Sequence, residues 1–218
     1  LEDAEAMTAF QDGNKDYGLD AGLSYTGKIV YRPLHNMKDA SLHIGAAVSY
    51  RNPKTSSTDG YNAVRYSTRN STGINRKKFL DTDAIQYLDH ELAYTFELAG
   101  HYKGLRYEGA YIARQAFVDE AKWESKVGAN PNIKPASGWY VQAGYLLFGG
   151  KQNYDAGGAK YTRTNNGREW GDIELCARVE YCNLNISKYI MGGSAYAYTL
   201  GLNYHVTRNV KFVINYQY

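Results

Sequence analysis

Two arginines at alternate positions offer the clearest chemistry in this sequence. In the stretch GYNAVRYSTR, Arg65 and Arg69 flank Ser67. Alternate residues of an extended strand point to one face and lie about 6.8 Å apart, so both guanidinium groups face the same way. A guanidinium group is always charged and presents a planar fork of donors that fits phosphate oxygens. The row is therefore suited to binding oxyanions.

Further charged side chains fall on the polar side of alternating stretches. The basic ones are Lys28, Arg32, Arg51, Arg106, Arg114, Arg178 and Lys211, and the acidic ones are Asp20, Glu97, Glu108, Glu174 and Glu180. Basic groups are in surplus, which favours contact with anions. The alternative is that most of them form cross-strand ion pairs that brace the sheet, as Arg106 and Glu108 could with their neighbours.

Histidines and cysteines give no sign of catalysis or of a metal site. His43, His101 and His205 share the polar side, but no serine and acid stand near any of them in a spacing typical of a triad. Cys176 and Cys182 share one face of one stretch about 20 Å apart, which is too far for a disulfide, and no metal-ligand spacing accompanies them. GGKQNYDAGG lacks the helix and the Lys-Ser pair of a nucleotide loop. We therefore expect no enzyme activity, no metal or cofactor, and two reduced thiols on the polar side.

The elements that must position these side chains are β-strands. Nine stretches alternate apolar and polar residues, and they occupy 17–32, 41–51, 60–69, the hairpin 91–117, 138–150, 171–184 and the hairpin 199–218. None of their apolar positions carries Lys, Arg, Asp or Glu. A helix is expected only around 117–125, and no apolar run is long enough for a transmembrane helix. The pattern predicts an all-β protein.

The apolar rows could contact either a protein core or lipid. A charge facing lipid costs about 2–4 kcal/mol, but a soluble β-sandwich core would exclude charge as well. The polar rows favour lipid, because they hold many glycines and alanines that suit a crowded concave interior, and because tyrosines gather near strand ends as in an aromatic girdle. We therefore expect a transmembrane antiparallel β-barrel. A soluble sandwich that binds carbohydrate is the alternative, and the net charge of +3 is too small to indicate nucleic acid.

Several stretches, taken together, resemble the phosphate-selective porin O and P family. They are LHIGAAVSYRNP, VRYSTRNSTGINRKKFLDT, GWYVQAGYLLFGGKQNYD, GDIELCARVEYCNLN and GGSAYAYTLGLNYHVTRNVKFVINY, in this order. The resemblance runs from about Tyr17 to Tyr216. Its most specific parts are GWYVQAGYLLFGG and TLGLNYHVTRNVKFVINY, where aromatic, glycine and asparagine positions match in register.

The resemblance implies a sixteen-stranded barrel in the bacterial outer membrane, usually a homotrimer, in contact with the lipid bilayer and lipopolysaccharide. About nine of its strands would be present here, so that residues 1–218 would form the C-terminal portion of a single barrel domain. Without its other strands, such a sheet would leave unpaired backbone edges in lipid. We therefore expect the upstream strands, a constriction loop and a closing strand to lie outside this sequence.

The resemblance also assigns a role to the arginine row. The family lines its pore with a ladder of arginines on a segment of the form R-x-R-x-R, which corresponds to Arg65, Ser67 and Arg69 with the middle arginine replaced. The replacement weakens the case for strict phosphate selectivity. The expected anion pathway comprises Arg65, Ser67, Arg69, Arg76, Arg106, Arg114, Arg178 and Lys211.

The expected function is passive uptake of inorganic anions, phosphate or polyphosphate, through this pathway. A general diffusion porin whose arginines only brace the wall, and a scaffold barrel that does not conduct, are the alternatives. The barrel interpretation makes a test of side-chain direction possible. Leu98, Tyr107, Val141, Leu175, Leu200 and Phe212 should face lipid, whereas Glu97, Arg106, Gln142, Arg178 and Lys211 should face inward.

Overall fold

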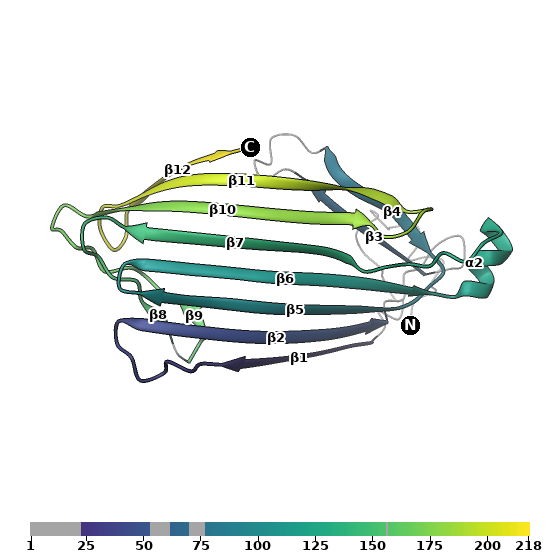
Figure 1. Cartoon of the computed structure of the whole chain (residues 1–218), viewed down its shortest axis with the longest axis horizontal. Helices are drawn as coiled ribbons and strands as arrows, with labels where there is room; N and C mark the ends of the chain where they lie inside the picture. The colour runs from purple at the N-terminus through teal and green to yellow at the C-terminus, as the bar shows by residue number, and fades with distance from the viewer. Residues whose placement is uncertain (1–22, 53–61, 70–76, 156) are drawn as a thin grey trace, which may run out of the picture.

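One broad antiparallel sheet makes up most of the protein. The computed structural model describes residues 23–52, 62–69, 77–155 and 157–218. Eight strands lie side by side in the order β1–β2–β5–β6–β7–β10–β11–β12 (Figure 1). Their bounds are β1 Leu23–Tyr31, β2 Ala40–Asn52, β5 Leu88–Tyr102, β6 Leu105–Val118, β7 Ala136–Leu146, β10 Asp172–Asn185, β11 Met191–His205 and β12 Lys211–Gln217.

The register of these strands gives the sheet one apolar face and one polar face. Rows of paired residues cross the sheet, and one row runs through Ile29, Ala46, Phe96, Tyr111, Trp139, Tyr181 and Tyr196. The next row, on the other face, runs through Lys28, Ala47, Thr95, Ile112, Gly138, Cys182 and Ala195. Because side chains alternate along each strand, these two rows define the apolar face and the polar face for the whole sheet.

The expected direction of the side chains is confirmed. Leu98, Val141, Leu175, Leu200 and Phe212 are exposed on the apolar face, and Tyr107 shares that face half-buried. Glu97, Arg106, Gln142, Arg178 and Lys211 belong to the polar face. Among the described residues no second sheet covers the apolar face, so the arrangement differs from a soluble sandwich, whose apolar faces pack together.

Two short hairpins lie apart from the large sheet. The strands β3 (Ala63–Arg69) and β4 (Lys78–Gln86) pair with each other, as do β8 (Tyr154–Asp155) and β9 (Lys160–Tyr161). Figure 1 places β3 and β4 at one end of the sheet and β8 and β9 at the other. The expectation that residues 60–69 supply a further strand of the same wall is therefore wrong. Of the nine expected strands, eight join the large sheet, and the first of them is described only from Leu23.

A compact core joins the β3–β4 hairpin to the end of the sheet. Its buried side chains are Tyr66, Leu80, Ile85, Leu88, Ala116, Trp123, Ala136, Leu184, Ile186 and Ile190. They come from the hairpin, from four strands of the sheet, from the helix α2 and from the turn between β10 and β11. Burial of such apolar side chains stabilises the docking by about 1.5–3 kcal/mol for each large one. The hairpin is thus held firmly against the polar face.

The helix α2 (Glu120–Val127) lies close to the expected place, 117–125. Asp119 caps its first turn, because the carboxylate accepts the Lys122 amide at 3.2 Å. Gly128 ends the helix with a φ of 78°, a left-handed conformation that glycine adopts without strain. In the part of the chain that the structure describes, no helix combines the length and the apolar character needed to cross a membrane.

Candidate anion site

The β3–β4 hairpin holds the arginine row above the polar face. Because side chains alternate along β3, Tyr66 points toward the sheet, where its buried hydroxyl donates to Glu91 of β5 at 3.0 Å. Thr82 of β4 bonds both the amide and the carbonyl of Tyr66. Arg65, on the other side of the strand, is left exposed. Irregular pairing at two points of the hairpin means that the row is not an ideal ladder with even spacing.

Arg65 is held by two aspartates of the neighbouring strand. Its Nε and Nη2 donate to the two oxygens of Asp81 at 2.7 and 2.5 Å, and Nη2 also reaches Asp83 at 3.1 Å. The hydrogen bond from Arg65 holds the pKa of the Asp81 carboxyl well below its usual range, and the same bond raises the pKa of Arg65. Sequence reasoning missed this pairing, although Asp81 and Asp83 stand in the quoted segment VRYSTRNSTGINRKKFLDT and just beyond it.

Arg69 differs from Arg65 in its surroundings. The side chains of Ser67 and Arg69 are exposed, and within the described ranges Arg69 has no carboxylate partner. A guanidinium group without a partner keeps all its donors for a passing anion. The expected site residue Arg76 lies outside the described residues.

A cavity of about 690 Å³ brings five of the eight expected residues together. Arg65, Ser67 and Arg69 line it from the hairpin, and Arg114 and Arg178 line it from the sheet. Ala136, Gly138, Ala195 and Ala197 of the polar face form part of its lining. These small side chains leave room between hairpin and sheet, which gives the glycines and alanines of the polar rows a function.

The wall arginines are braced by carboxylates, as the alternative interpretation anticipated. Arg114 lies 3.6 Å from Glu91, and Arg178 lies 2.5 Å from Glu180. Arg178 also donates to Gln142 at 2.9 Å and lies over the ring of Tyr140. Glu91 therefore joins the hairpin and the wall, since it accepts from Tyr66 and pairs with Arg114.

Arg106 and Lys211 lie away from the 690 Å³ cavity. Arg106 lies 2.9 Å from Glu174 and lines a second, smaller cavity of about 240 Å³. Arg178 lines both cavities and so connects them. Lys211 is opposite His205 at the end of β12. The expected surplus of positive charge is thus largely balanced, because Lys28 also pairs, with Glu97 at 2.5 Å.

Two buried carboxylates, Asp172 and Glu174, organise the other end of the sheet, and only the second of them was named from the sequence. Asp172 is fully buried and accepts the backbone amides of Phe148, Gly150 and Gly167 at 2.8–3.0 Å. A side chain at position 167 would collide with the Phe148 carbonyl, so only glycine allows this approach. Glu174 accepts from Gln152 and Asn203, in addition to its contact with Arg106. Gly150 of GGKQNYDAGG therefore serves a structural turn.

Asp172 fixes a long connection that folds back over the polar face. This connection runs from β7 to β10 and contains β8 and β9. Tyr154 bonds His43 of β2, and the hydroxyl of Tyr161 donates to the carbonyl oxygens of Gly100 and Tyr107. The polar face is therefore covered by one hairpin at each end, with the arginine cavity beside β3–β4.

Cysteines and histidines take structural positions. Cys176 and Cys182 are free thiols on the polar face, which confirms the expectation. His101 lies 2.6 Å from the hydroxyl of Ser41, but the nearby Asp39 pairs with Lys151, so no catalytic triad forms. Across the described ranges, no three His, Cys, Asp or Glu side chains gather as a metal site would need.

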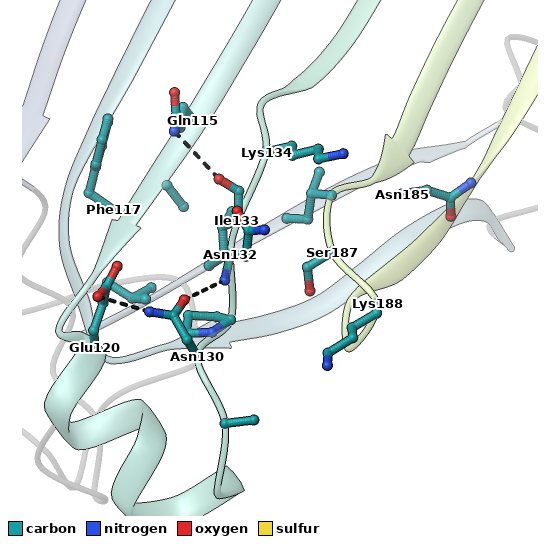
Figure 2. Close-up of a pocket in the computed structure, with 15 residues that line it drawn as sticks. Gln115, Phe117, Glu120, Asn130, Asn132, Ile133, Lys134, Asn185, Ser187 and Lys188 are labelled. Atoms are coloured by element: carbon teal, nitrogen blue, oxygen red, sulfur yellow. Dashed lines mark hydrogen bonds between the residues drawn. The ribbon is translucent and has the colours of Figure 1, made fainter.

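A larger cavity, of about 1000 Å³, lies at the α2 end of the sheet. Figure 2 shows its walls, with Gln115 and Phe117 of β6 on one side and Asn185, Ser187 and Lys188 on the other. None of the seven expected site residues that the structure describes lines it. It is therefore distinct from the arginine cavity.

Comparison with known families identifies the one to which this chain is similar. The model of a family described as phosphate-selective porin O and P matches residues 3–217. A search of curated proteins found no match. The family is one of channels and not of enzymes.

Proposed function

Because the chain belongs to the phosphate-selective porin O and P family, whose members are bacterial outer-membrane proteins, we propose that it passes anions through an arginine-lined pore. Phosphate or polyphosphate is the proposed solute. The observation that supports this most is the meeting of Arg65, Ser67, Arg69, Arg114 and Arg178 around one cavity. Strands far apart in the sequence supply these side chains, so their meeting depends on the fold.

The two faces of the sheet fit a wall between lipid and water. Large apolar side chains such as Ile29, Leu200 and Ile214 are more than half exposed, which in water would cost solubility. In a bilayer the same exposure is favourable, and an antiparallel barrel wall alternates in this way. The described strands then form part of a larger barrel, for which sixteen strands and a trimer remain our expectation.

The cavity suits transfer better than tight binding. Arg65 already pairs with two carboxylates, and Arg114 and Arg178 each pair with one. A phosphate at these positions must therefore compete with carboxylates of the protein. Arg69 has no such competitor among the described residues. Conduction needs sites that attract an ion and then release it, and partly neutralised arginines meet both requirements.

Removing both arginines of the hairpin tests the proposal. Arg65→Ala together with Arg69→Ala should lower the anion-over-cation permeability ratio severalfold, because charge acts more strongly in a narrow channel than in open water. The block of chloride current by added phosphate should weaken as well. Single-channel recordings of the protein purified from outer membranes measure both.

The matched control is Arg208→Ala, an exposed arginine in the turn between β11 and β12. It removes one positive charge far from the cavity and should leave selectivity unchanged. If the double variant keeps its anion preference and its phosphate block, the arginines of the hairpin are structural.

A general diffusion porin is the second candidate. The ion pairs of Lys28, Arg106, Arg114 and Arg178 favour it, because a braced wall need not select for charge. Such a channel would conduct anions and cations about equally and would show no phosphate block. A scaffold barrel would not conduct at all.

A further inference from the structure

The 1000 Å³ cavity lies where the apolar face ends. Along β6 the apolar row runs through Tyr111 and Ala113 and continues to Gln115 and Phe117, which line the cavity. Phe117 stacks on His90 at 4.3 Å, and His90 stacks on Tyr50, an exposed side chain of the same face. On the polar face this end is filled by the compact core around Trp123, and Ala116 and Ile186 of that core also line the cavity. The cavity therefore opens beside the apolar face.

An aromatic group marks the border of the apolar face at this end. Trp139, Tyr181 and Tyr196 lie together with ring centroids 4.5–6.3 Å apart. Tryptophan and tyrosine gather at the level of lipid headgroups in membrane proteins. Farther toward this end, the same face carries Ser137, two residues before Trp139, and Asn183, two residues after Tyr181. Both residues are polar, and they lie opposite each other on β7 and β10. The cavity thus lies at headgroup depth, just beyond the apolar belt.

The lining combines two cations with several amides. Lys134 and Lys188 have no carboxylate partner among the described residues, whereas Glu120 already accepts from Asn130 at 3.0 Å. In Figure 2 the side chain of Lys134 extends from the loop toward the side of Asn185. Ammonium groups bind phosphate as point charges, and amides both donate to and accept from hydroxyl groups. This lining suits a ligand with phosphate and many hydroxyl groups.

We propose that this cavity binds the phosphorylated sugar headgroup of an outer-membrane glycolipid. Two of the three long connections lie at this end, where residues 53–87 join β2 to β5 and 119–135 join β6 to β7, whereas the third, 147–171, folds back over the polar face at the other end. Outer-membrane barrels place their longer loops outside, facing the glycolipid leaflet. The volume also exceeds what a small phospholipid headgroup requires, because pockets of about 300–1,000 Å³ hold drug-sized ligands. The site depends on the outer-membrane location and not on anion conduction.

Lipid binding by charge-neutral variants tests the site. Lys134→Gln with Lys188→Gln should bind purified lipopolysaccharide, trimmed to lipid A and inner core sugars, about tenfold more weakly than the unaltered protein in detergent. Lys126→Gln is the matched control, since Lys126 is exposed on α2 at the same end but does not line the cavity. Anion selectivity should be the same in all three proteins, which separates this site from the pore. Heat-dependent migration on gels verifies that each variant is folded.

Three further probes decide the occupant. The dephosphorylated glycolipid and phosphatidylethanolamine should both bind more weakly than the phosphorylated glycolipid, and inorganic phosphate alone should not displace it at equal concentration. Equal binding of phosphatidylethanolamine would overturn the proposal in favour of general lipid contact. Displacement by inorganic phosphate would make the cavity a site for the free ion. Equal glycolipid binding by the double variant and Lys126→Gln would exclude the cavity.

Discussion

At the scale of single residues, Asp81 controls how much of Arg65 is available to an anion. Its two oxygens take both donors of the guanidinium fork, and Lys78 adds a third contact at 3.3 Å. Arg69 lacks such a partner within the described ranges. We therefore expect the two arginines of one row to differ in affinity for anions, for a reason that lies on the opposite strand.

Releasing Arg65 should strengthen phosphate binding. In Asp81→Asn the guanidinium loses its charged partner, so phosphate should block chloride current at a roughly threefold lower concentration. Asp83→Asn, whose carboxylate makes only the longer 3.1 Å contact, should change the block less. An unchanged block in Asp81→Asn would mean that Arg65 does not touch the solute.

The ion pair between Arg65 and Asp81 also predicts that the anion selectivity of the channel does not change in mild acid. Because the pKa of Asp81 is lowered in the folded protein, the stabilisation from the pair is present above the usual pKa near 3.8 and is lost only as the pH falls through the lowered value. Asp81 should therefore stay ionised between about pH 7 and pH 5, and the contribution of Arg65 to chloride preference should stay constant over this range. Recordings of the unaltered channel and of Asp81→Asn over this range should run parallel, and a rise confined to the unaltered channel would contradict the pairing.

At the scale of elements, two hairpins use different means to stay on the polar face. The β3–β4 hairpin docks through an apolar core and through Tyr66. The connection that carries β8 and β9 has only short strands, and it depends on the backbone amides bound by Asp172. Polar anchoring substitutes for apolar burial where a segment faces water.

Asp172→Asn should loosen this connection. The new amide group would direct hydrogens at backbone donors, so at least one buried hydrogen bond is lost at a cost of about 1–3 kcal/mol. Proteolysis between residues 148 and 168 should become faster, while Asp155→Asn, which affects one exposed turn, should leave it nearly unchanged. Equal proteolysis rates in the two variants would contradict the anchoring role of Asp172.

At the scale of the whole molecule, the two faces of the sheet differ in character, as the proposed wall between lipid and water requires. Leu200 on β11 is 62% exposed on the apolar face, and the adjacent Thr199 points to the polar face and lines the 240 Å³ cavity. Each strand repeats this contrast between neighbours. The membrane assignment therefore rests on alternation along the entire sheet.

A charge placed on each face tests the assignment directly. Leu200→Arg should destabilise the protein folded in liposomes by about 2–4 kcal/mol, because the charge enters lipid. Thr199→Arg, one position away, should cost much less because its side chain reaches water. Urea unfolding in liposomes measures the difference, and equal destabilisation by the two changes would contradict a lipid-facing apolar side.

The sequence alone determined the two faces of the alternating stretches. Alternation is a local property, so the directions of Leu98, Arg106 and Lys211 followed from spacing along each strand. The residues of the arginine row could also be named from their spacing and from the family resemblance. Both inferences needed no knowledge of which strand pairs with which.

Only the tertiary structure decided which strands form the wall and which charges are neutralised. An inserted hairpin alternates as a wall strand does, so nothing local in residues 63–69 reveals that they pair with 78–86 and leave the sheet. The alternation of 78–86 is itself interrupted at Asp83, whose φ is 55°. Asp81 reaches Arg65 from the paired strand β4, and Glu91 reaches Arg114 across the hairpin of β5 and β6. Their contact depends on register and docking, which are set by burial of the core around Tyr66 and not by spacing along the chain.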